Sequence, residues 1–206
     1  MFEFGLILAN TKRSEIYLKY LQKHKIHPKC IIFYSTSQKS SNLNKLFKKY
    51  NSEIKIIKTN NINSKKFEKI LTKLYINNFL FSGYPGEIIK NLKILKSYNI
   101  FHSHSGDLPS YKGSTTIYYS ILNKDKIVCT TIILNHKIDE GEIVYKKNYP
   151  YPKKNKIDFY DYEIRIKNFI YYIKSKKKYN FKKTVNNNYF YKIHPILRNI
   201  ANSTLS

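Results

Sequence analysis

Short apolar runs alternate with amphipathic stretches along the first hundred residues. Within residues 14–23, Ile16, Tyr17, Tyr20 and Leu21 recur at helical spacing and mark one apolar face. The same patterns predict strands at Phe4–Ala9, Lys29–Tyr34, Glu53–Ile57 and Phe79–Phe81, and helices at Ser14–Lys23, Leu43–Tyr50 and Phe67–Leu74, with a polar loop over Ser35–Asn42. Strands separated by helices of this length favour right-handed βαβ units and a mostly parallel sheet.

The pattern changes after residue 100. Two β-rich runs joined by the turn His136–Gly141 are typical of an antiparallel strand pair. The expected elements are a strand at Ile100–His104, a helix at Thr115–Leu122, strands at Lys126–Leu134 and Glu142–Tyr149, a helix at Phe159–Ile173, a short strand or hairpin at Tyr189–Lys192 and a final turn around Pro195. The predicted fold class is therefore α/β and Rossmann-like: a mostly parallel central sheet with helices on both faces and an antiparallel pair near the C-terminal end.

The chain is long enough and contains enough apolar residues to form its own hydrophobic core. A chain of 206 residues suits one domain. No apolar run approaches the roughly 18 residues of a membrane span, and Met1–Ala9 contains Glu3 and resembles a first strand more than a signal peptide. Cys30 and Cys129 lie within β-branched runs, which is typical of buried thiols in a reducing compartment. We therefore expect a cytoplasmic protein without a membrane partner.

The net charge of +25 raises the question of a nucleic-acid partner. Lysines occur in nearly every segment, together with many Asn, Ile and Tyr residues, and A/T-rich codons explain that composition without any function. The densest runs, Lys153–Lys156 and Lys174–Lys178, are typical of solvated faces. We do not expect nucleic acid to be the partner, and an anionic small substrate is compatible with the charge.

The candidate chemistry lies in two loops at the ends of predicted strands. His104 ends an apolar run just before a loop containing Gly106, Pro109 and Gly113, and Asp139 lies in the later turn between the two β-rich runs. Ligands of open parallel sheets bind beyond the carboxyl ends of the strands, where such a pair can transfer protons.

Two other interpretations of the histidines stay open from the residues alone. His102 and His104, two positions apart on a strand, share one face and can be structural or can bind a metal ion. A zinc site would need a third and a fourth ligand, and the two cysteines lie on other strands. Spacing therefore does not decide between a catalytic and a structural histidine pair, and we expect no metal.

The residues from about Phe79 to Tyr149 resemble the catalytic core of the formyltransferases that use 10-formyltetrahydrofolate. The family signature is Asn-x-His, then Ser, Leu-Pro, a basic residue with Gly, and later Asp-x-Gly with an aliphatic residue. The matching residues here are His104, Leu108-Pro109, Lys112-Gly113 and Asp139-Glu140-Gly141 with Ile143. The run Lys112–Thr116 and the tail with Ile193-His194-Pro195 are similar to a small branch of the family that acts on amino sugars. Two positions depart from the signature, because His102 replaces the Asn and Gly106 replaces the Ser.

The resemblance implies a formyltransferase catalytic domain over residues 1–150, with residues 151–206 as a C-terminal helix and short β/turn extension packed on it. It implies 10-formyltetrahydrofolate as the co-substrate and no metal. The implied catalytic residues are His102, His104 and Asp139, where an imidazole N–H of His102 takes the place of the family's Asn as the donor to the formyl oxygen. The implied residues around the folate are Phe81, Gly83, Tyr84, Pro85, Ile88, Ile138, Glu140 and Gly141. The aromatic residues Phe81 and Tyr84 are equally compatible with simple packing of their loop.

The acceptor is inferred by elimination among the family's substrates. The methionyl-tRNA enzymes carry a C-terminal barrel of about a hundred residues, and only some 55 residues follow Pro150 here. A small-molecule amine is left, and an amino sugar on a nucleotide suits the basic charge. Asn10, Thr11, Lys12 and Arg13 at the start of the first helix, with Lys112 and Gly113, are the expected acceptor-binding residues; an N-cap with solvated charges explains the first four equally well.

Three points stay open at this stage. One alternative to an amino-sugar formyltransferase is a methionyl-tRNA formyltransferase-like protein without the barrel, and another is a non-catalytic relative. A homodimer is compatible with the sequence, which does not decide the oligomeric state.

Overall fold

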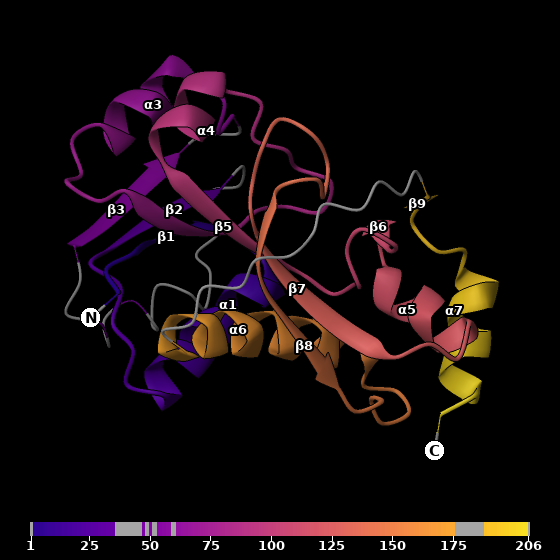
Figure 1. Cartoon of the computed structure of the whole chain (residues 1–206). Helices are drawn as coiled ribbons and strands as arrows, with labels where there is room; N and C mark the ends of the chain where they lie inside the picture. Colours follow the sequence, from indigo (N-terminus) through magenta and orange to yellow (C-terminus); the bar gives the residue numbers. More distant parts are fainter. Residues whose placement is uncertain are drawn as a thin grey trace. The chain divides into compact units, whose positions relative to one another are not determined.

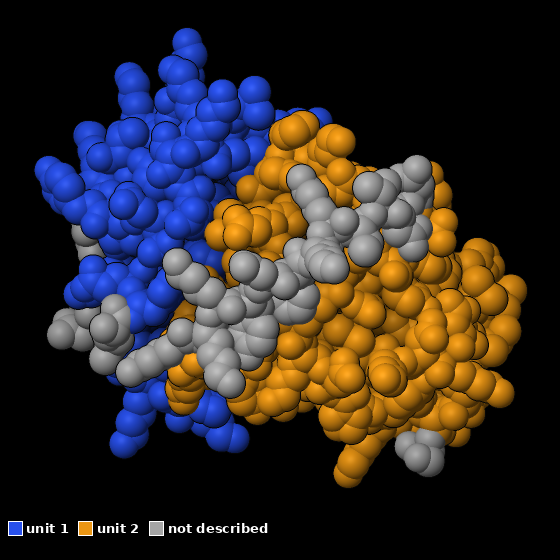
Figure 2. Space-filling view, viewed as in Figure 1, with its two compact units in different colours: residues 1–102 blue, residues 103–206 orange. Residues whose placement is uncertain are grey.

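The computed structural model describes residues 2–35, 47, 50, 53–58, 61–175 and 188–205. The chain divides into two compact units, Met1–His102 and Ser103–Ser206 (Figure 2). The helix expected at Leu43–Tyr50 and most of the loop expected over Ser35–Asn42 lie outside the described residues. The domain boundary predicted at residue 150 stays a prediction.

The first unit is built on a parallel sheet. Its strands are β1 (Gly5–Ala9), β2 (Cys30–Ser35), β3 (Glu53–Lys58), β4 (Asn78–Ser82) and the start of β5 (Asn99–His104). They lie in the order β3-β2-β1-β4-β5, and the four neighbouring pairs are all parallel. Every residue of β1 is buried, as expected for a central strand that is covered on both faces.

Helices α1 (Lys12–Lys23), α3 (Lys65–Leu71) and α4 (Leu92–Ser97) connect these strands, with α1 on one side of them and α3 and α4 on the other (Figure 1). Thr11, Ser64 and Asn91 cap the three helices by accepting hydrogen bonds from backbone N–H groups of the first turns. The sequence did not predict α4, because a helix of six residues is too short to show a helical period of apolar residues.

The second unit contains the end of β5 and an antiparallel pair. Ser103 on β5 and Thr131 on β7 (Ile127–Ile133) share a hydrogen bond of 2.9 Å between their side-chain oxygens. Strand β7 pairs with β8 (Glu142–Tyr149) in antiparallel register. The strand order of the whole sheet, β3-β2-β1-β4-β5-β7-β8, confirms the predicted mostly parallel sheet with an antiparallel pair toward the C-terminal end.

Helix α6 (Ile157–Ser175) packs on β7 and β8, and α5 (Thr116–Leu122) packs on α7 (Pro195–Ser203). Ile117 and Ile121 of α5 share one buried cluster with Ile193, Ala201 and Leu205 near the C-terminus. The tail therefore contributes to the core of the second unit. None of the helices in the described part of the chain combines the length and apolar character needed to cross a bilayer.

Of the two expectations for the tail, one is confirmed and one is wrong. Tyr189–Phe190 (β9) is the short strand of the two alternatives, and it pairs in parallel with Lys112–Gly113 (β6), far away in the sequence. The predicted turn around Pro195 is the start of helix α7, in which His194 accepts a hydrogen bond from the Ile196 N–H and Pro195 occupies the first turn. Proline suits that position because the first N–H groups of a helix have no partner within it.

Candidate active site

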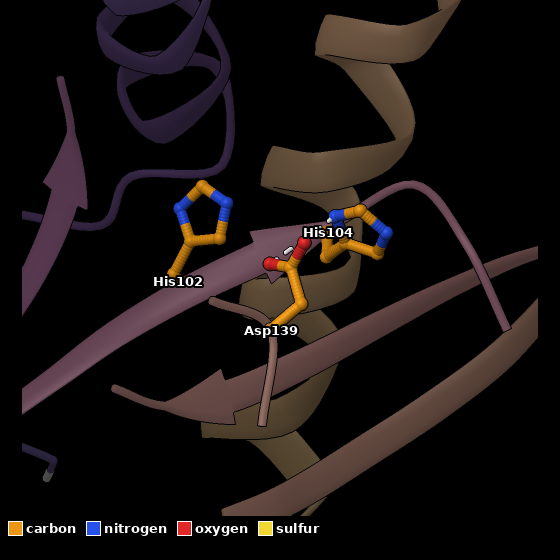
Figure 3. A group of neighbouring side chains, drawn as sticks. All are labelled: His102, His104 and Asp139. Carbon is orange, nitrogen blue, oxygen red and sulfur yellow. Dashed lines mark ion pairs between the residues drawn. The ribbon is translucent and has the colours of Figure 1, made fainter. Parts of the chain in front are cut away.

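His104 and Asp139 lie side by side, as the sequence predicted. His104 is the last residue of β5, and Asp139 lies in the turn between β7 and β8 (Figure 3). The Nδ1 atom of His104 is 3.6 Å from Oδ1 of Asp139, and the two side chains are 3% and 10% exposed. That distance is longer than a direct hydrogen bond but short enough for strong electrostatic coupling in a buried place.

The ring of His104 is held from its other nitrogen. Nε2 lies 2.7 Å from the carbonyl oxygen of Tyr111 and 3.3 Å from Oγ1 of Thr116. A carbonyl oxygen can only accept, so Nε2 carries hydrogen and Nδ1 faces Asp139. Gly106 makes room for this arrangement, since a Cβ there would lie 2.7 Å from Nε2 and 2.6 Å from the Tyr111 oxygen.

Asp139 is fixed by the backbone around it. Its φ of 53° lies in the left-handed region, which residues with side chains seldom adopt and which is often found at functional sites. Its Oδ2 accepts a hydrogen bond of 2.8 Å from the N–H of Gly113. Gly141 closes the turn, because a Cβ there would lie 1.9 Å from the carbonyl oxygen of Ile133. One carboxylate oxygen is thus tied down and the other faces the imidazole.

Lys112 and Glu140, predicted to contact the acceptor and the folate, bond to each other. Nζ of Lys112, which is 4% exposed, lies 2.9 Å from Oε1 of Glu140, and the Tyr189 hydroxyl donates to the same oxygen at 2.8 Å. The hydrogen bond from Lys112, then that from Tyr189, lowers the pKa of Glu140 from 4.5 to about 2. These groups brace the turn that carries Asp139, and a role in ligand binding stays a prediction.

The structure adds a buried arginine that the sequence analysis missed. Arg165 on α6 donates to the carbonyl oxygen of Ser103 at 2.9 Å, to Oγ of Ser105 at 2.8 Å and to Asp161 at 2.9 Å. Ser103 and Ser105 flank His104, so the guanidinium holds the end of β5 in place. A signal was present, because Arg165 interrupts an apolar helix face four residues after Asp161, the spacing of an ion pair.

The residues predicted to receive the acceptor in the first unit have partners within that unit. Thr11 caps α1, and Lys12 forms an ion pair of 2.9 Å with Glu15. Arg13 donates to the Ser82 hydroxyl and to the carbonyl oxygen of Gly83. These contacts agree with the N-cap interpretation, and acceptor binding by residues 10–13 stays a prediction.

The folate-binding residues predicted between Phe81 and Ile88 fall into two groups. Phe81 and Gly83 are buried, and the Tyr84 ring packs edge-on against Tyr34 at 5.8 Å. Pro85 is exposed and Ile88 half-buried. Packing therefore accounts for the two aromatic residues. In the second unit, Ile138 is 46% exposed beside Asp139 and offers an apolar surface to a ligand.

His102 completes the group. It lies two residues before His104 on β5, half-buried, with its ring 6.5 Å from that of Phe81. One ligand atom each of His102, His104 and Asp139 lies within 4.8 Å of the other two (Figure 3). The site therefore offers two imidazoles and one carboxylate around a common point.

Comparison with known proteins connects this geometry to one family. No protein-family model matches the chain. The chain is 32% identical over 95 residues to the methionyl-tRNA formyltransferase of Halothermothrix orenii. The aligned segment covers 46% of the chain and 30% of that protein. It is 32% identical over 96 residues to the methionyl-tRNA formyltransferase of Buchnera aphidicola, and this aligned segment covers 46% of the chain and 31% of that protein.

Solved structures with the same fold include enzymes of three kinds. A methionyl-tRNA formyltransferase from Clostridium thermocellum matches 95% of the chain and 74% of its own length at 16% identity, with a TM-score of 0.61. A sugar N-formyltransferase from a Shewanella species matches 97% of the chain and 86% of its own at 14% identity, also with 0.61. A glycinamide ribonucleotide transformylase from Symbiobacterium toebii matches 84% of the chain and 86% of its own length at 13% identity, again with a TM-score of 0.61.

These comparisons differ in how much of each protein they cover. The aligned part spans about a third of the length of the curated relatives, whereas the solved structures match the chain over most of its length. The fold is thus common to all three kinds of enzyme, and the equal TM-scores do not separate their acceptors.

Proposed function

We propose that this chain is a formyltransferase, as its fold and the similarity of part of its sequence support, and that it transfers a formyl group from 10-formyltetrahydrofolate to the amine of a small-molecule acceptor. The proposed acceptor is an amino sugar carried on a nucleotide. The observation that carries the proposal is the buried pair of His104 and Asp139, whose facing atoms lie 3.6 Å apart.

The pair suits the proton transfers that the reaction requires. When the acceptor nitrogen attacks the formyl carbon, that nitrogen loses a proton, the formyl oxygen gains negative charge, and the folate nitrogen gains a proton as it leaves. Asp139 has one carboxylate oxygen free of the Gly113 N–H and can take the amine proton through a water molecule. His104 can pass a proton through Nδ1, because Nε2 stays bonded to the Tyr111 carbonyl.

Negative charge on the oxygen needs donors placed in advance. In its protonated form His104 donates from both nitrogens, to Tyr111 through Nε2 and to the reacting oxygen through Nδ1. We assign His102 as the second donor, since it lies on the same strand two residues earlier. Removing one such donor typically costs about 10²–10³ in kcat.

The binding surfaces follow from the same proposal. In the second unit, the exposed Ile138 beside Asp139 and the backbone of residues 138–141 would hold the folate ring system. For Gly83, Pro85 and Ile88 in the first unit, the same role rests on the family resemblance alone. Lys112 would supply positive charge for the acceptor, and we expect it to exchange Glu140 for a phosphate oxygen when the acceptor binds. For Arg13, binding of the acceptor likewise rests on the resemblance.

A second acceptor class has specific support. The relatives found by sequence are methionyl-tRNA formyltransferases, and the net charge of +25 suits a polyanion. The small acceptor is preferred because of the similarity of Lys112–Thr116 and residues 193–195 to the amino-sugar branch. The two classes are distinguished by direct assay.

The experiment incubates purified protein with 10-formyltetrahydrofolate and, separately, a panel of nucleotide-linked amino sugars and charged initiator tRNA, and follows the release of tetrahydrofolate. We expect release with at least one amino sugar and none with the tRNA. His104→Ala and Asp139→Asn should each lower kcat by about 10²–10⁴. Asp107→Asn, which changes a surface carboxylate bonded to Lys146, is the matched control and should retain the wild-type rate.

Each other outcome changes the proposal in a defined way. Turnover with tRNA alone would replace the amino sugar by the second acceptor class. Absence of turnover with every amine, combined with folate binding at wild-type affinity in His104→Ala, would support a non-catalytic relative and reject the proposed enzyme.

A further inference from the structure

We propose that His102, His104 and Asp139 form a binding site for a divalent transition-metal ion of the zinc class. The sequence analysis grouped Asp139 with the two histidines as catalytic residues but did not count it as a metal ligand, and we expected no metal. The fold brings Asp139 to the histidine pair, and two imidazoles plus a carboxylate are a recurrent ligand set for such ions.

The spacing fits a shared ion. Two ligands of one tetrahedral zinc ion lie about 3.4 Å apart, given zinc–ligand bonds of about 2.0–2.2 Å. The Nδ1 atom of His104 and Oδ1 of Asp139 are separated by 3.6 Å. With one ligand atom taken from each residue, all distances in the group are within 4.8 Å, and rotation of the His102 ring would complete the set.

The hydrogen bonds that hold His104 and Asp139 in place support the same proposal. A metal-bound histidine almost always donates its other ring N–H to a carbonyl or carboxylate oxygen, which fixes the tautomer. His104 makes this contact through Nε2 to the Tyr111 carbonyl. Asp139 is oriented in the same way, because Oδ2 accepts from the Gly113 N–H and leaves Oδ1 toward the imidazole.

The pair itself is arranged like two ligands of one ion. The Nδ1 atom of His104 and Oδ1 of Asp139 face each other, and both side chains are largely buried. A metal ion bound by three side chains keeps at least one open position for water or for another ligand.

A bound ion would change what the site does. It would occupy the Nδ1 lone pair and the carboxylate oxygen on which the proposed formyl transfer depends. Metal binding and formyl transfer would therefore exclude each other at this centre, and zinc would act as an inhibitor that a chelator reverses. This inhibition rests on the proposed function, whereas the binding itself does not.

The test uses tag-free, chelator-treated full-length protein, titrated with Co²⁺ and, in competition with a chromogenic chelator, with Zn²⁺. We expect one equivalent to bind, with visible d–d absorption of the tetrahedral or five-coordinate cobalt form, and thermal stability to rise with zinc concentration. His102→Asn and Asp139→Asn should each weaken binding by more than the roughly 10–100-fold that a second-shell change costs. His136→Asn, which changes an exposed histidine three residues from Asp139, is the matched control and should bind like the wild type.

Two results would overturn the proposal: no stoichiometric binding by the wild type, or equal weakening in His136→Asn and His102→Asn. The cobalt spectrum and the zinc-dependent melting temperature of the wild type decide the first point even if a variant does not fold. Zinc sensitivity of formyl transfer, measured for each protein against its own metal-free rate, is a separate readout. A protein that binds zinc but transfers no formyl group would keep the metal site and reject the proposed enzyme.

Discussion

Single residues set the geometry of the turn that carries Asp139. Glu140 follows Asp139 directly and is held by Lys112 and Tyr189, while the N–H of Gly113 holds Asp139 itself. The position of the carboxylate therefore depends on neighbours that do not touch the imidazole. Lys112 and Glu140, which the sequence predicted as ligand contacts, therefore also support this turn.

Glu140→Gln tests this support through its pH dependence. The pKa of Glu140 is about 2 in the folded protein and 4.5 as its ordinary value, so its ionised form stabilises the fold above about pH 4.5, and this contribution disappears as the pH falls toward 2. The side chain is 26% exposed, which limits the loss at pH 7 to about 1 kcal/mol, or about 2–4 °C in melting temperature. Melting curves of both proteins between pH 7 and pH 2.5 should converge at the acid end, and a constant difference would contradict the assignment.

At the scale of elements, helix α6 determines where β5 ends. Arg165 bonds to the carbonyl oxygen of Ser103 and to the hydroxyl of Ser105, and Asp161 one turn earlier balances its charge. Both side chains are largely buried, with 9% and 14% exposed. A buried ion pair of this kind does little for net stability when complete but is costly to break.

Arg165→Gln should therefore lower the free energy of unfolding by about 3–5 kcal/mol, as measured by urea denaturation. Addition of Asp161→Asn should recover part of that loss, because it removes the uncompensated charge. Arg198→Gln is the matched control: its pair with Asp158 is about half exposed on both sides, and we expect a loss below about 1 kcal/mol. If Arg165→Gln and Arg198→Gln lowered the free energy of unfolding equally, burial of the Arg165 network would not add to its contribution to stability.

The pairing of β6 with β9 depends on a glycine. Gly113 has a φ of 104°, and a Cβ there would lie 2.2 Å from the carbonyl oxygen of Phe190. We expect Gly113→Ala to separate the two strands, to weaken the hold on Asp139 and to lower stability by more than 2 kcal/mol, on the order of the strain and packing costs of such sites. Gly86→Ala also has a positive φ but no atom within 4 Å of the added Cβ, so about 1 kcal/mol is expected there. Urea unfolding of the two variants measures the difference.

At the scale of the whole molecule, the charge of +25 influences every encounter with an anion. A basic surface attracts a nucleotide-linked sugar and a tRNA alike, so charge does not identify the acceptor. The number of phosphates that the protein contacts does distinguish the acceptors. Each contacted phosphate releases counterions, so the affinity depends more steeply on salt when more phosphates are contacted.

We expect the KM for a nucleotide-linked amino sugar to rise by no more than about tenfold between about 50 and 200 mM salt. A tRNA acceptor that engages 6–10 phosphates would lose about 10³–10⁵ in affinity over the same range. Initial-rate measurements at several salt concentrations distinguish the two acceptor classes. A steep salt dependence with the amino sugar would contradict binding through a few phosphates.

The sequence by itself determined much of this protein. Apolar periodicity is a local property, so most strands and helices, the parallel sheet and the antiparallel pair β7–β8 followed from it within one or two residues at each end. The placement of His104 and Asp139 in neighbouring turns also followed, because the carboxyl end of β5 and the turn between β7 and β8 lie at one edge by topology. The motif blocks then indicated the resemblance to the formyltransferases.

Only the tertiary structure decided which residues support the site and what else the site can hold. The contacts of Arg165, the bond between Lys112 and Glu140, and the parallel pairing of β6 with β9 join segments far apart in the chain, and no local pattern encodes them. The sequence grouped Asp139 with His102 and His104, but only the folded chain shows that one ligand atom of each lies within 4.8 Å of the other two, and the proposed metal site depends on that distance. The tertiary structure decides such chemistry, because folding sets the distances between side chains that are far apart in the sequence.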